Sequence, residues 1–244
     1  MEHSQSAGAY SIDMIKEFSE GSTIIVDKPL NWTSFDVVNK IRWNLKQKLG
    51  VKKIKVGHAG TLDPLATGVL VLCVGKHTKL IEQIQAGTKT YTGKILLGKT
   101  TPSYDLETEF DQEFAVDHIS KELMEEARLS FLGEQQQVPP IFSAKQVDGK
   151  RAYDLARAGK EIVLKANAIH IFDLSFDSSN FPEISFEVSC SKGTYIRSIA
   201  SDLGKKLNSG GTLIELRRTK SGDQNIEESK SVEEWIDFIH NSPL

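Results

Sequence analysis

The pattern of apolar and polar residues predicts strands and helices interspersed along the chain. Apolar runs over residues 22–28 and 69–75 are typical of buried strands, and residues 183–190 alternate between apolar and polar side chains. Apolar residues three and four positions apart predict amphipathic helices, most clearly over residues 35–48 and 117–132. Both kinds of element are therefore expected in one fold.

Weaker patterns complete this prediction. We expect Ser34 and Asp117 to cap the two helices named above. Further strands are expected over 53–58, 88–98, 141–147 and 212–219, and further helices over 151–159, 195–207 and 231–240. Because the elements do not follow a regular βαβ repeat, they favour an α+β fold with a mainly antiparallel or mixed central sheet and flanking helices.

Composition restricts the class of protein. The chain has 244 residues, of which 39% are apolar and 26% charged, as is usual for a soluble globular domain. The sequence contains no apolar run of about 18 residues, the length that is needed to span a bilayer. Its first 20 residues do not resemble a secretory signal. Cys73 and Cys190 lie in apolar runs, which suits free buried thiols. We expect a cytoplasmic protein without a metal site, with a loosely ordered segment over 1–21 before a single domain over 22–244.

The distribution of charge modifies what the net charge implies. A net charge of −3 weakly opposes nucleic-acid binding. Seven basic residues and no acidic ones nevertheless lie between positions 40 and 55, namely Lys40, Arg42, Lys46, Lys48, Lys52, Lys53 and Lys55. A second group consists of Lys192, Arg197, Lys205, Lys206, Arg217, Arg218 and Lys220. One such group is usually a solvated face, but two groups beside polar loops indicate a nucleic-acid partner.

A glycine-rich loop between two predicted strands carries a single carboxylate. Residues 57–68 read GHAGTLDPLATG, with Asp63 immediately before Pro64. The proline disfavours helical backbone at Asp63, and the glycines allow a substrate or another backbone to approach closely. A carboxylate held in this way could act as a nucleophile or a base. An Asp-Pro dipeptide more often makes an ordinary turn than a catalytic site, so the loop alone does not establish catalysis.

The segment from His58 to Pro64 resembles the signature of the TruB family of tRNA pseudouridine synthases. Further motifs similar to those of the family follow in the same order, namely Asp27-Lys28-Pro29, Lys89-Thr90-Tyr91, Val138-Pro139-Pro140 with Phe142-Ser143-Ala144, Ser191-Lys192-Gly193-Thr194-Tyr195-Ile196-Arg197 and Leu216-Arg217-Arg218. The resemblance extends from about residue 22 to residue 220. It implies the pseudouridine synthase fold and favours catalysis over a simple turn at Asp63.

The resemblance also implies a reaction. Uridine becomes pseudouridine when the bond between N1 and C1′ breaks and the uracil rejoins through C5, which requires no cofactor. The implied catalytic residues are Asp63, which would attack C1′ or remove a sugar proton, its partner Arg197, and Tyr91, which would pack on the base and help remove the C5 proton. The implied substrate contacts are His58, Tyr91, Tyr195 and Leu216, with Lys28 in support.

The family's substrate is the uridine at position 55 in the T arm of tRNA, which must leave its stack to react. We therefore expect tRNA as the partner, with His58 and the basic helix 35–48 contacting it, no membrane, no obligate protein partner, and a monomer. Alternatives are a synthase acting on another RNA, and an RNA chaperone that binds without turnover. The presence of Asp63, Tyr91 and Arg197 favours catalysis.

Three features depart from this resemblance or compete with it. Residues 93–100 match a phosphate-loop pattern, but an apolar strand occupies the middle and Pro102 follows where a helix should begin, which argues against nucleotide binding. Residues 99–109 differ from the threonine- and aspartate-rich stretch that is more common in the family. Most bacterial relatives continue into a small RNA-binding PUA domain, whereas this sequence stops at Leu244, so we expect a catalytic domain alone.

Overall fold

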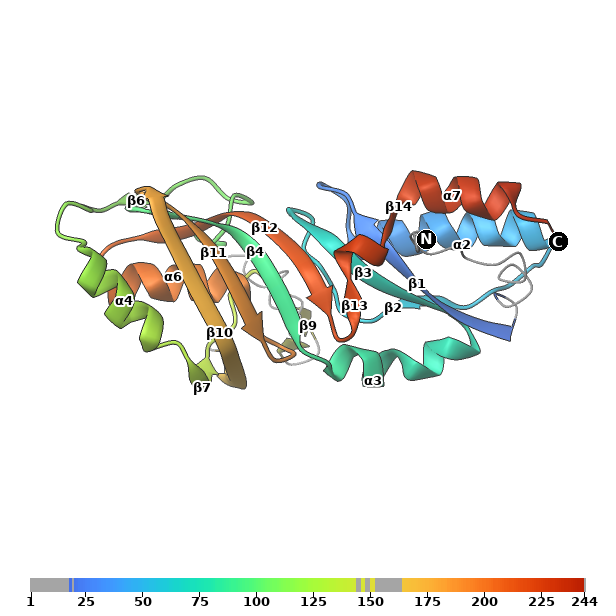
Figure 1. The fold of residues 1–244 in the computed structure, drawn as a ribbon, viewed down its shortest axis with the longest axis horizontal. Coiled ribbons are helices and arrows are strands. Elements are labelled where there is room, and N and C mark those ends of the chain that lie inside the picture. The colour runs from blue at the N-terminus through green and yellow to red at the C-terminus, as the bar shows by residue number, and fades with distance from the viewer. Residues whose placement is uncertain (1–17, 19, 144–145, 148–149, 152–163, 244) are drawn as a thin grey trace, which may run out of the picture. The chain divides into compact units, whose positions relative to one another are not determined.

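The computed structural model of the chain describes residue 18 and residues 20–143, 146–147, 150–151 and 164–243 (Figure 1). Most of the expected N-terminal segment over 1–21, and the expected helix over 151–159 apart from Arg151, lie outside these residues. The chain forms two compact units. The first contains residues 1–87 and 218–244, and the second contains residues 88–217.

The first unit is built on a mixed sheet. Strand β1 (Gly21–Lys28) pairs antiparallel with β3 (Ala66–Gly75) and parallel with β14 (Lys230–Ser231), while β2 (Val56–His58) pairs antiparallel with β3. Two helices, α2 (Ser34–Leu49) and α7 (Val232–Asn241), lie side by side along this sheet (Figure 1). Their apolar faces and the sheet bury a core that includes Val26, Ile41, Leu45, Leu70 and Trp235.

A smaller apolar cluster lies elsewhere in the first unit. Ile25, Val69 and Val71 form it with Ala59, and Ile81 and Ile84 pack against them. The last two residues belong to the short helix α3 (Ile81–Ala86), which follows the 3₁₀ turn η1 (Lys76–Leu80). The unit also contains β13 (Gln224–Asn225), which pairs with the end of β12, and the 3₁₀ turn η2 (Ile226–Glu228). Alternate residues of β1 and β3 thus enter two different apolar clusters.

The second unit contains an antiparallel sheet. Its strands lie in the order β4 (Lys89–Leu97), β11 (Glu183–Cys190), β10 (Asn167–Asn180) and β7 (Gly133–Gln137), with antiparallel pairing throughout. Strand β12 (Gly211–Ser221) lies beside β4 here and continues into the first unit. The helices are α4 (Lys121–Leu129) and α6 (Ile196–Lys206), and the short strand pairs are β5 (Lys99–Thr100) with β6 (Gln112–Glu113) and β8 (Gln146–Val147) with β9 (Lys150–Arg151). The predicted α+β class with a mainly antiparallel, mixed sheet is confirmed.

Two predicted helix starts were wrong. Thr33, not Ser34, caps α2: its side chain accepts a hydrogen bond from the Asp36 amide, and the Asp36 carboxylate accepts one from the Thr33 amide. Helix α4 begins after Ser120 rather than at Asp117, because the Ser120 hydroxyl accepts a hydrogen bond from the Leu123 amide. The cap that forms is the one whose side chain reaches a free amide of the first turn.

Some predicted strands are shorter, and others were missed. The strand expected over 53–58 starts only at Val56, because its partner β3 ends at Gly75. Residues 141–143 bend after two prolines that lack amide donors, so among the described residues of the expected strand only 146–147 are extended in a strand pair. Arg151 lies in β9 instead of opening a helix. We predicted neither β10, in which a register shift between Ile171 and Asp173 breaks the alternation, nor the polar β7.

Candidate active site

Asp63 lies in the first unit, on the loop that joins β2 to β3, as predicted. The Asp63 carbonyl accepts a hydrogen bond from the Ala66 amide at 3.0 Å, and the Pro64 carbonyl accepts one from the Asn31 amide at 2.8 Å. Asp63 is half-buried, between the buried Leu62 and the exposed Pro64. The loop therefore presents its carboxylate from a backbone that is hydrogen-bonded on both sides of the proline.

Lys28 is buried beneath this loop and does not lie in a solvated turn. Its ammonium donates hydrogen bonds to the carbonyls of Pro29 at 2.9 Å, Trp32 at 2.6 Å and Pro64 at 3.4 Å. Burial lowers the pKa of Lys28 to about 8, and the negative charge of Asp63 opposes that decrease. Lys28 thus ties the end of β1 to the residue after Asp63.

Ser34 holds the residue before Asp63. Its buried hydroxyl donates a hydrogen bond to the Leu62 carbonyl at 3.1 Å and accepts one from the Leu62 amide at 2.9 Å. Since Thr33 caps the helix, the Ser34 side chain is available for this reciprocal contact. The first turn of α2 is therefore attached directly to the loop that carries Asp63.

Arg218 is the main residue of this region that sequence reasoning missed. In the sequence it belongs to the second group of basic residues, a pattern that is usually solvated, but it is only 1% exposed. Its Nε donates to the Val69 carbonyl at 2.7 Å, and its two terminal nitrogens donate to Gly60 at 3.0 Å and Thr61 at 3.5 Å. The sequence signal that could have suggested this role was its place in the Leu216-Arg217-Arg218 motif.

His58 ends β2 just before the loop and is half-buried. Its Nδ1 is buried and has no hydrogen-bond partner in the described part of the chain. Burial, and then the positive charge of Arg218, lower the pKa of His58 below its ordinary value. The imidazole is therefore neutral at pH 7 and can accept or donate a hydrogen bond.

Arg197 lies in the second unit, in the first turn of α6, and is 4% exposed. Its Nε is 3.6 Å from a carboxylate oxygen of Asp105, and a terminal nitrogen donates to the Ser103 carbonyl at 3.3 Å. The Asp105 carboxylate also accepts a hydrogen bond from the Glu107 amide at 3.0 Å. Asp105 lies in the stretch 99–109 that departs from the family pattern, and only the structure reveals its pairing with Arg197.

The other residues implied by the resemblance also lie in the second unit. Tyr91 on β4 is 8% exposed, and Leu216 on β12 is 9% exposed. Tyr195 directly precedes α6, where its backbone is held from both directions by one side chain: its amide donates to Gln137 Oε1 at 2.8 Å, and its carbonyl accepts from Gln137 Nε2 at 3.0 Å. A glutamine at the end of β7 thereby fixes the residue that leads into Arg197.

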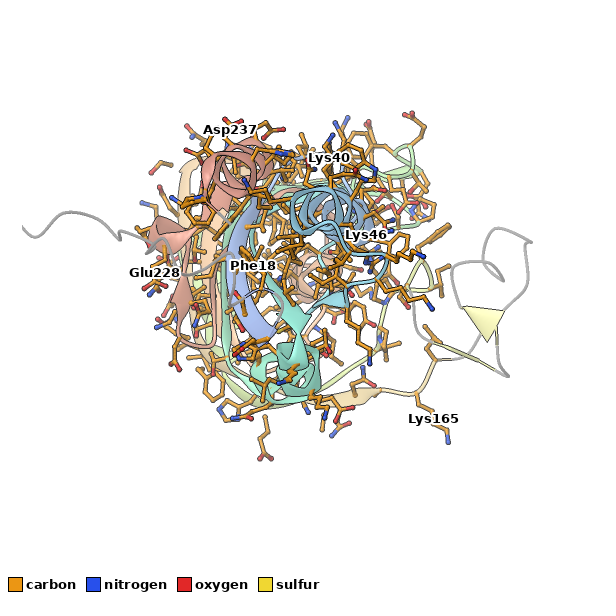
Figure 2. All side chains as sticks on the ribbon, turned by 90° about the vertical axis from the view of Figure 1, so that its right-hand side faces the viewer. Phe18, Lys40, Lys46, Lys165, Glu228 and Asp237 are labelled. Atoms are coloured by element: carbon orange, nitrogen blue, oxygen red, sulfur yellow. The ribbon has the colours of Figure 1, made fainter. Side chains whose placement is uncertain are left out.

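The first basic group is a surface, and two of its members have additional roles. Lys40, Lys52, Lys53 and Lys55 are exposed, whereas Arg42 donates to the Val56 carbonyl at 2.8 Å and Lys48 donates to the His240 carbonyl at 2.9 Å. Figure 2 labels Lys40 and Lys46 on α2. Phe35 and Trp43 of the same helix are 61% and 58% exposed. We call the segment from Lys40 to Lys55 the basic surface.

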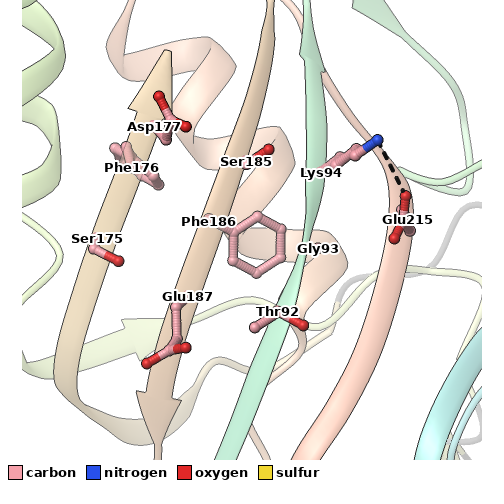
Figure 3. A pocket seen from close by; sticks show the side chains of 10 residues that line it. All are labelled: Thr92, Gly93, Lys94, Ser175, Phe176, Asp177, Ser185, Phe186, Glu187 and Glu215. Atoms are coloured by element: carbon pink, nitrogen blue, oxygen red, sulfur yellow. Dashed lines mark ion pairs between the residues drawn. The ribbon is translucent and has the colours of Figure 1, made fainter. Parts of the chain in front are cut away.

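The phosphate-loop-like stretch is a strand, as we predicted. Residues 93–97 belong to β4, and the Lys94 ammonium lies 3.2 Å from a Glu183 oxygen and 3.4 Å from a Glu215 oxygen. A shallow depression of about 390 Å³ lies there over β4, β10, β11 and β12, lined in part by Asp177, Glu187 and Glu215 (Figure 3). Such an acidic lining repels phosphate groups.

Neither a metal cluster nor a membrane span occurs in the described part of the chain. Across those residues, no three His, Cys, Asp or Glu side chains gather into a group that could hold a metal ion. Within the same ranges, every helix is too short or too polar to cross a lipid bilayer. Both cysteines are free and buried, as predicted.

Comparison with known proteins identifies the family. Residues 46–196 match the model of the TruB family pseudouridylate synthase (N terminal domain). A tRNA pseudouridine synthase B of Phocaeicola vulgatus is 56% identical over 223 residues, covering 90% of this chain and 95% of the relative. A tRNA pseudouridine synthase B of Parabacteroides distasonis is 51% identical over 226 residues, covering 93% and 96%.

Solved structures support the fold. A chain in the crystal structure of a Cbf5-Nop10-Gar1 complex has a TM-score of 0.69 at 24% identity, and the match covers 98% of this chain and 61% of that one. At this identity the likeness concerns the fold alone. The family match and the two relatives carry the further conclusion: the chain belongs to the TruB family of pseudouridylate synthases.

Proposed function

We propose that this enzyme isomerises the uridine at position 55 in the T arm of tRNA, with Asp63 as the essential carboxylate. The observation that carries the proposal is the support of the Asp63 loop, in which Lys28, Ser34 and Arg218 all bond to backbone atoms within a few residues of Asp63. The names of the curated relatives, tRNA pseudouridine synthase B, support tRNA as the substrate.

The reaction is an internal exchange of bonds. The N1–C1′ bond of uridine breaks, the uracil turns, a C5–C1′ bond forms, and the proton on C5 is lost to a base while N1 gains one. In the proposal, Asp63 either bonds to C1′ and is displaced when C5 attacks, or removes a proton from the sugar. Both roles require the ionised carboxylate. The ammonium of Lys28 interacts electrostatically with Asp63 in the same unit, and that positive charge favours the ionised form.

We further propose that residues of the second unit act on the same uridine. Arg197 is assigned as the partner of Asp63, and its guanidinium is already oriented by Asp105 and the Ser103 carbonyl. Tyr91 is assigned to pack on the base and help remove the C5 proton. Tyr195 and Leu216 are assigned as further substrate contacts. These assignments rest on the family resemblance.

The proposed RNA contacts of the first unit are His58 and the basic surface. Exposed lysines can neutralise phosphate groups, and the exposed rings of Phe35 and Trp43 can stack on unpaired bases. The neutral imidazole of His58 can hydrogen-bond to a base or sugar. The basic surface lacks acidic residues from Lys40 to Lys55, and such a run of positive charge favours contact with the phosphate groups of RNA.

Replacing Asp63 tests the proposal directly. Asp63→Asn keeps the shape of the side chain and removes its negative charge, so we expect pseudouridine formation to fall by several orders of magnitude with little change in RNA binding or melting temperature. Turnover is measured as tritium release from tRNA labelled at C5 of uridine. Asp237→Asn, on the exposed face of α7, is the matched control. Near-normal turnover by purified Asp63→Asn protein would exclude this role for Asp63.

The same experiment addresses the chaperone alternative. A protein that acts only by binding tRNA would show no turnover in the wild type, and Asp63→Asn would leave its effect on tRNA folding unchanged. Measured turnover by the wild-type protein would exclude that alternative as the sole function.

A further inference from the structure

Arg218 contacts the Asp63 loop on both sides of the carboxylate. Its guanidinium donates to Gly60 and Thr61, which precede Asp63, and to Val69, which follows it. These three acceptors are separated from Arg218 by about 150 residues of sequence, so the contacts exist only in the folded unit. One rigid, planar group therefore links the two ends of the loop.

The backbone of Arg218 is also in close contact with the loop. A side-chain carbon added at Gly68 would lie 2.2 Å from the Arg218 carbonyl oxygen and 2.8 Å from its amide nitrogen, and Gly68 has a φ of +102°. Gly60, whose carbonyl accepts the second hydrogen bond, has a φ of +107°. Both positions suit glycine for conformational reasons, and Gly68 also for lack of space. The loop thus follows the surface of Arg218 closely at both ends.

The positive charge of Arg218 is stabilised by neutral hydrogen-bond acceptors. All of the hydrogen bonds that the structure describes for its guanidinium end on backbone carbonyls. Burying a cation costs free energy unless polar groups surround it, and here three carbonyl dipoles provide that environment. The positive charge remains effective nearby, since it influences both Lys28 and His58.

From this geometry we propose that Arg218 is a positioning residue for catalysis, which fixes the Asp63 loop at both ends so that the carboxylate meets the sugar in a reactive orientation. Arg218 would act through the backbone and would not contact the substrate. The inference rests on the proposed function of Asp63. It predicts that loss of Arg218 impairs the chemical step more than the binding of tRNA, because a carboxylate displaced by about 1 Å can lose about 10²-fold in rate.

Two variants and a stability control test this inference. Arg218→Ala removes the guanidinium, and Arg218→Lys keeps the charge but cannot reach three carbonyls with a planar group. We expect kcat to fall about 10²-fold in Arg218→Ala and by less in Arg218→Lys, while KM for tRNA stays nearly constant. Trp235→Phe is the control, since it removes a buried hydrogen bond to the Ile25 carbonyl in the same unit. It should lower the melting temperature and leave kcat unchanged.

Chemical rescue separates positioning from general stability. Guanidinium chloride at millimolar concentration should restore part of the kcat of Arg218→Ala in a saturable manner, relative to sodium chloride at equal ionic strength, and should not raise the kcat of the control. If the Ala variant does not fold, Arg218→Lys decides the question. A folded Arg218→Lys protein with wild-type kcat, or a rise in KM as large as the fall in kcat, would overturn the inference. A wild-type protein without turnover would instead refute the proposed function.

Discussion

Two buried cations, Lys28 and Arg218, donate hydrogen bonds to the loop that carries Asp63. Lys28 is the one that can lose its charge within an accessible pH range. Its pKa falls from 10.5 to about 8 in the folded protein, chiefly through burial. Between these two values the unfolded chain binds a proton that the folded protein does not. The contribution of Lys28 to stability therefore increases as pH rises from about 8 to 10.5, and below about 8 the full cost of burying the charge remains.

We predict that wild-type protein gains stability relative to Lys28→Met as pH is raised through this window. The difference in unfolding free energy, measured by urea denaturation at pH 7.5 and pH 10, should move in favour of the wild type. At pH 7.5 the Met variant removes the donor to the carbonyls of Pro29 and Trp32, and the loss of such hydrogen bonds typically costs about 1–3 kcal/mol. A difference that is constant with pH would show that folding does not lower the pKa of Lys28.

The ion pair in the second unit leads to another prediction at this scale. Arg197 and Asp105 are both nearly buried, so Asp105→Asn leaves a buried guanidinium without its counter-charge. We expect a loss of about 3 kcal/mol in stability and a fall in kcat as Arg197 loses its orientation, measured by urea denaturation and tritium release. Asp111→Asn, an exposed site in the same region, is the control. An unchanged kcat in Asp105→Asn would show that catalysis does not depend on the orientation of Arg197 by Asp105.

At the scale of elements, α2 combines two functions on opposite faces. Its inner residues, including Val37, Val38 and Ile41, complete the core of the first unit. Its first turn holds the Asp63 loop through Ser34. The outer face and the segment that follows carry the basic surface. In the proposed function, an amphipathic helix of this kind lets one element support the Asp63 loop and present charge to RNA.

We predict that tRNA binding weakens steeply with salt and that this dependence involves the basic surface. Reversing Lys46, Lys52 and Lys53 to Glu should raise KM and flatten the plot of log affinity against log salt, because fewer counterions are released. Reversing Lys76, Lys79 and Lys121, three exposed lysines outside the basic surface, gives the same change in net charge as a control. An unchanged salt slope in the first variant would show that the basic surface does not contact the RNA.

At the scale of the whole molecule, the chain is a TruB-family pseudouridylate synthase, and the proposed function specifies which uridine it modifies. The proposed function predicts that cells lacking this protein lose pseudouridine at position 55 of their tRNAs and keep pseudouridine at other positions. Wild-type protein should restore the modification, and Asp63→Asn should not. Mapping of pseudouridine in total RNA measures this outcome. Loss at a different RNA site, with position 55 intact, would identify the alternative substrate.

The sequence alone was sufficient for much of the fold. Local periodicity predicted β1, β3, β4, β11 and β12 and the helices α2, α6 and α7 close to their observed bounds, because these elements have regular apolar faces. Prediction failed where the local pattern was irregular or polar, as in β10 with its register shift and in β7. The place of Asp63 on a loop between two strands was also evident from the sequence.

Only the tertiary structure decided which charged residues are internal. Lys28, Arg197 and Arg218 resemble surface residues in the sequence, yet each is nearly or fully buried. Each of them has at least one partner that is distant in the chain, at 36, 94 and up to 158 positions, and no local pattern encodes contacts at such separations. Burial of a cation depends on whether folding brings enough acceptors around it, and that condition is met only once the strands and loops of each unit have packed.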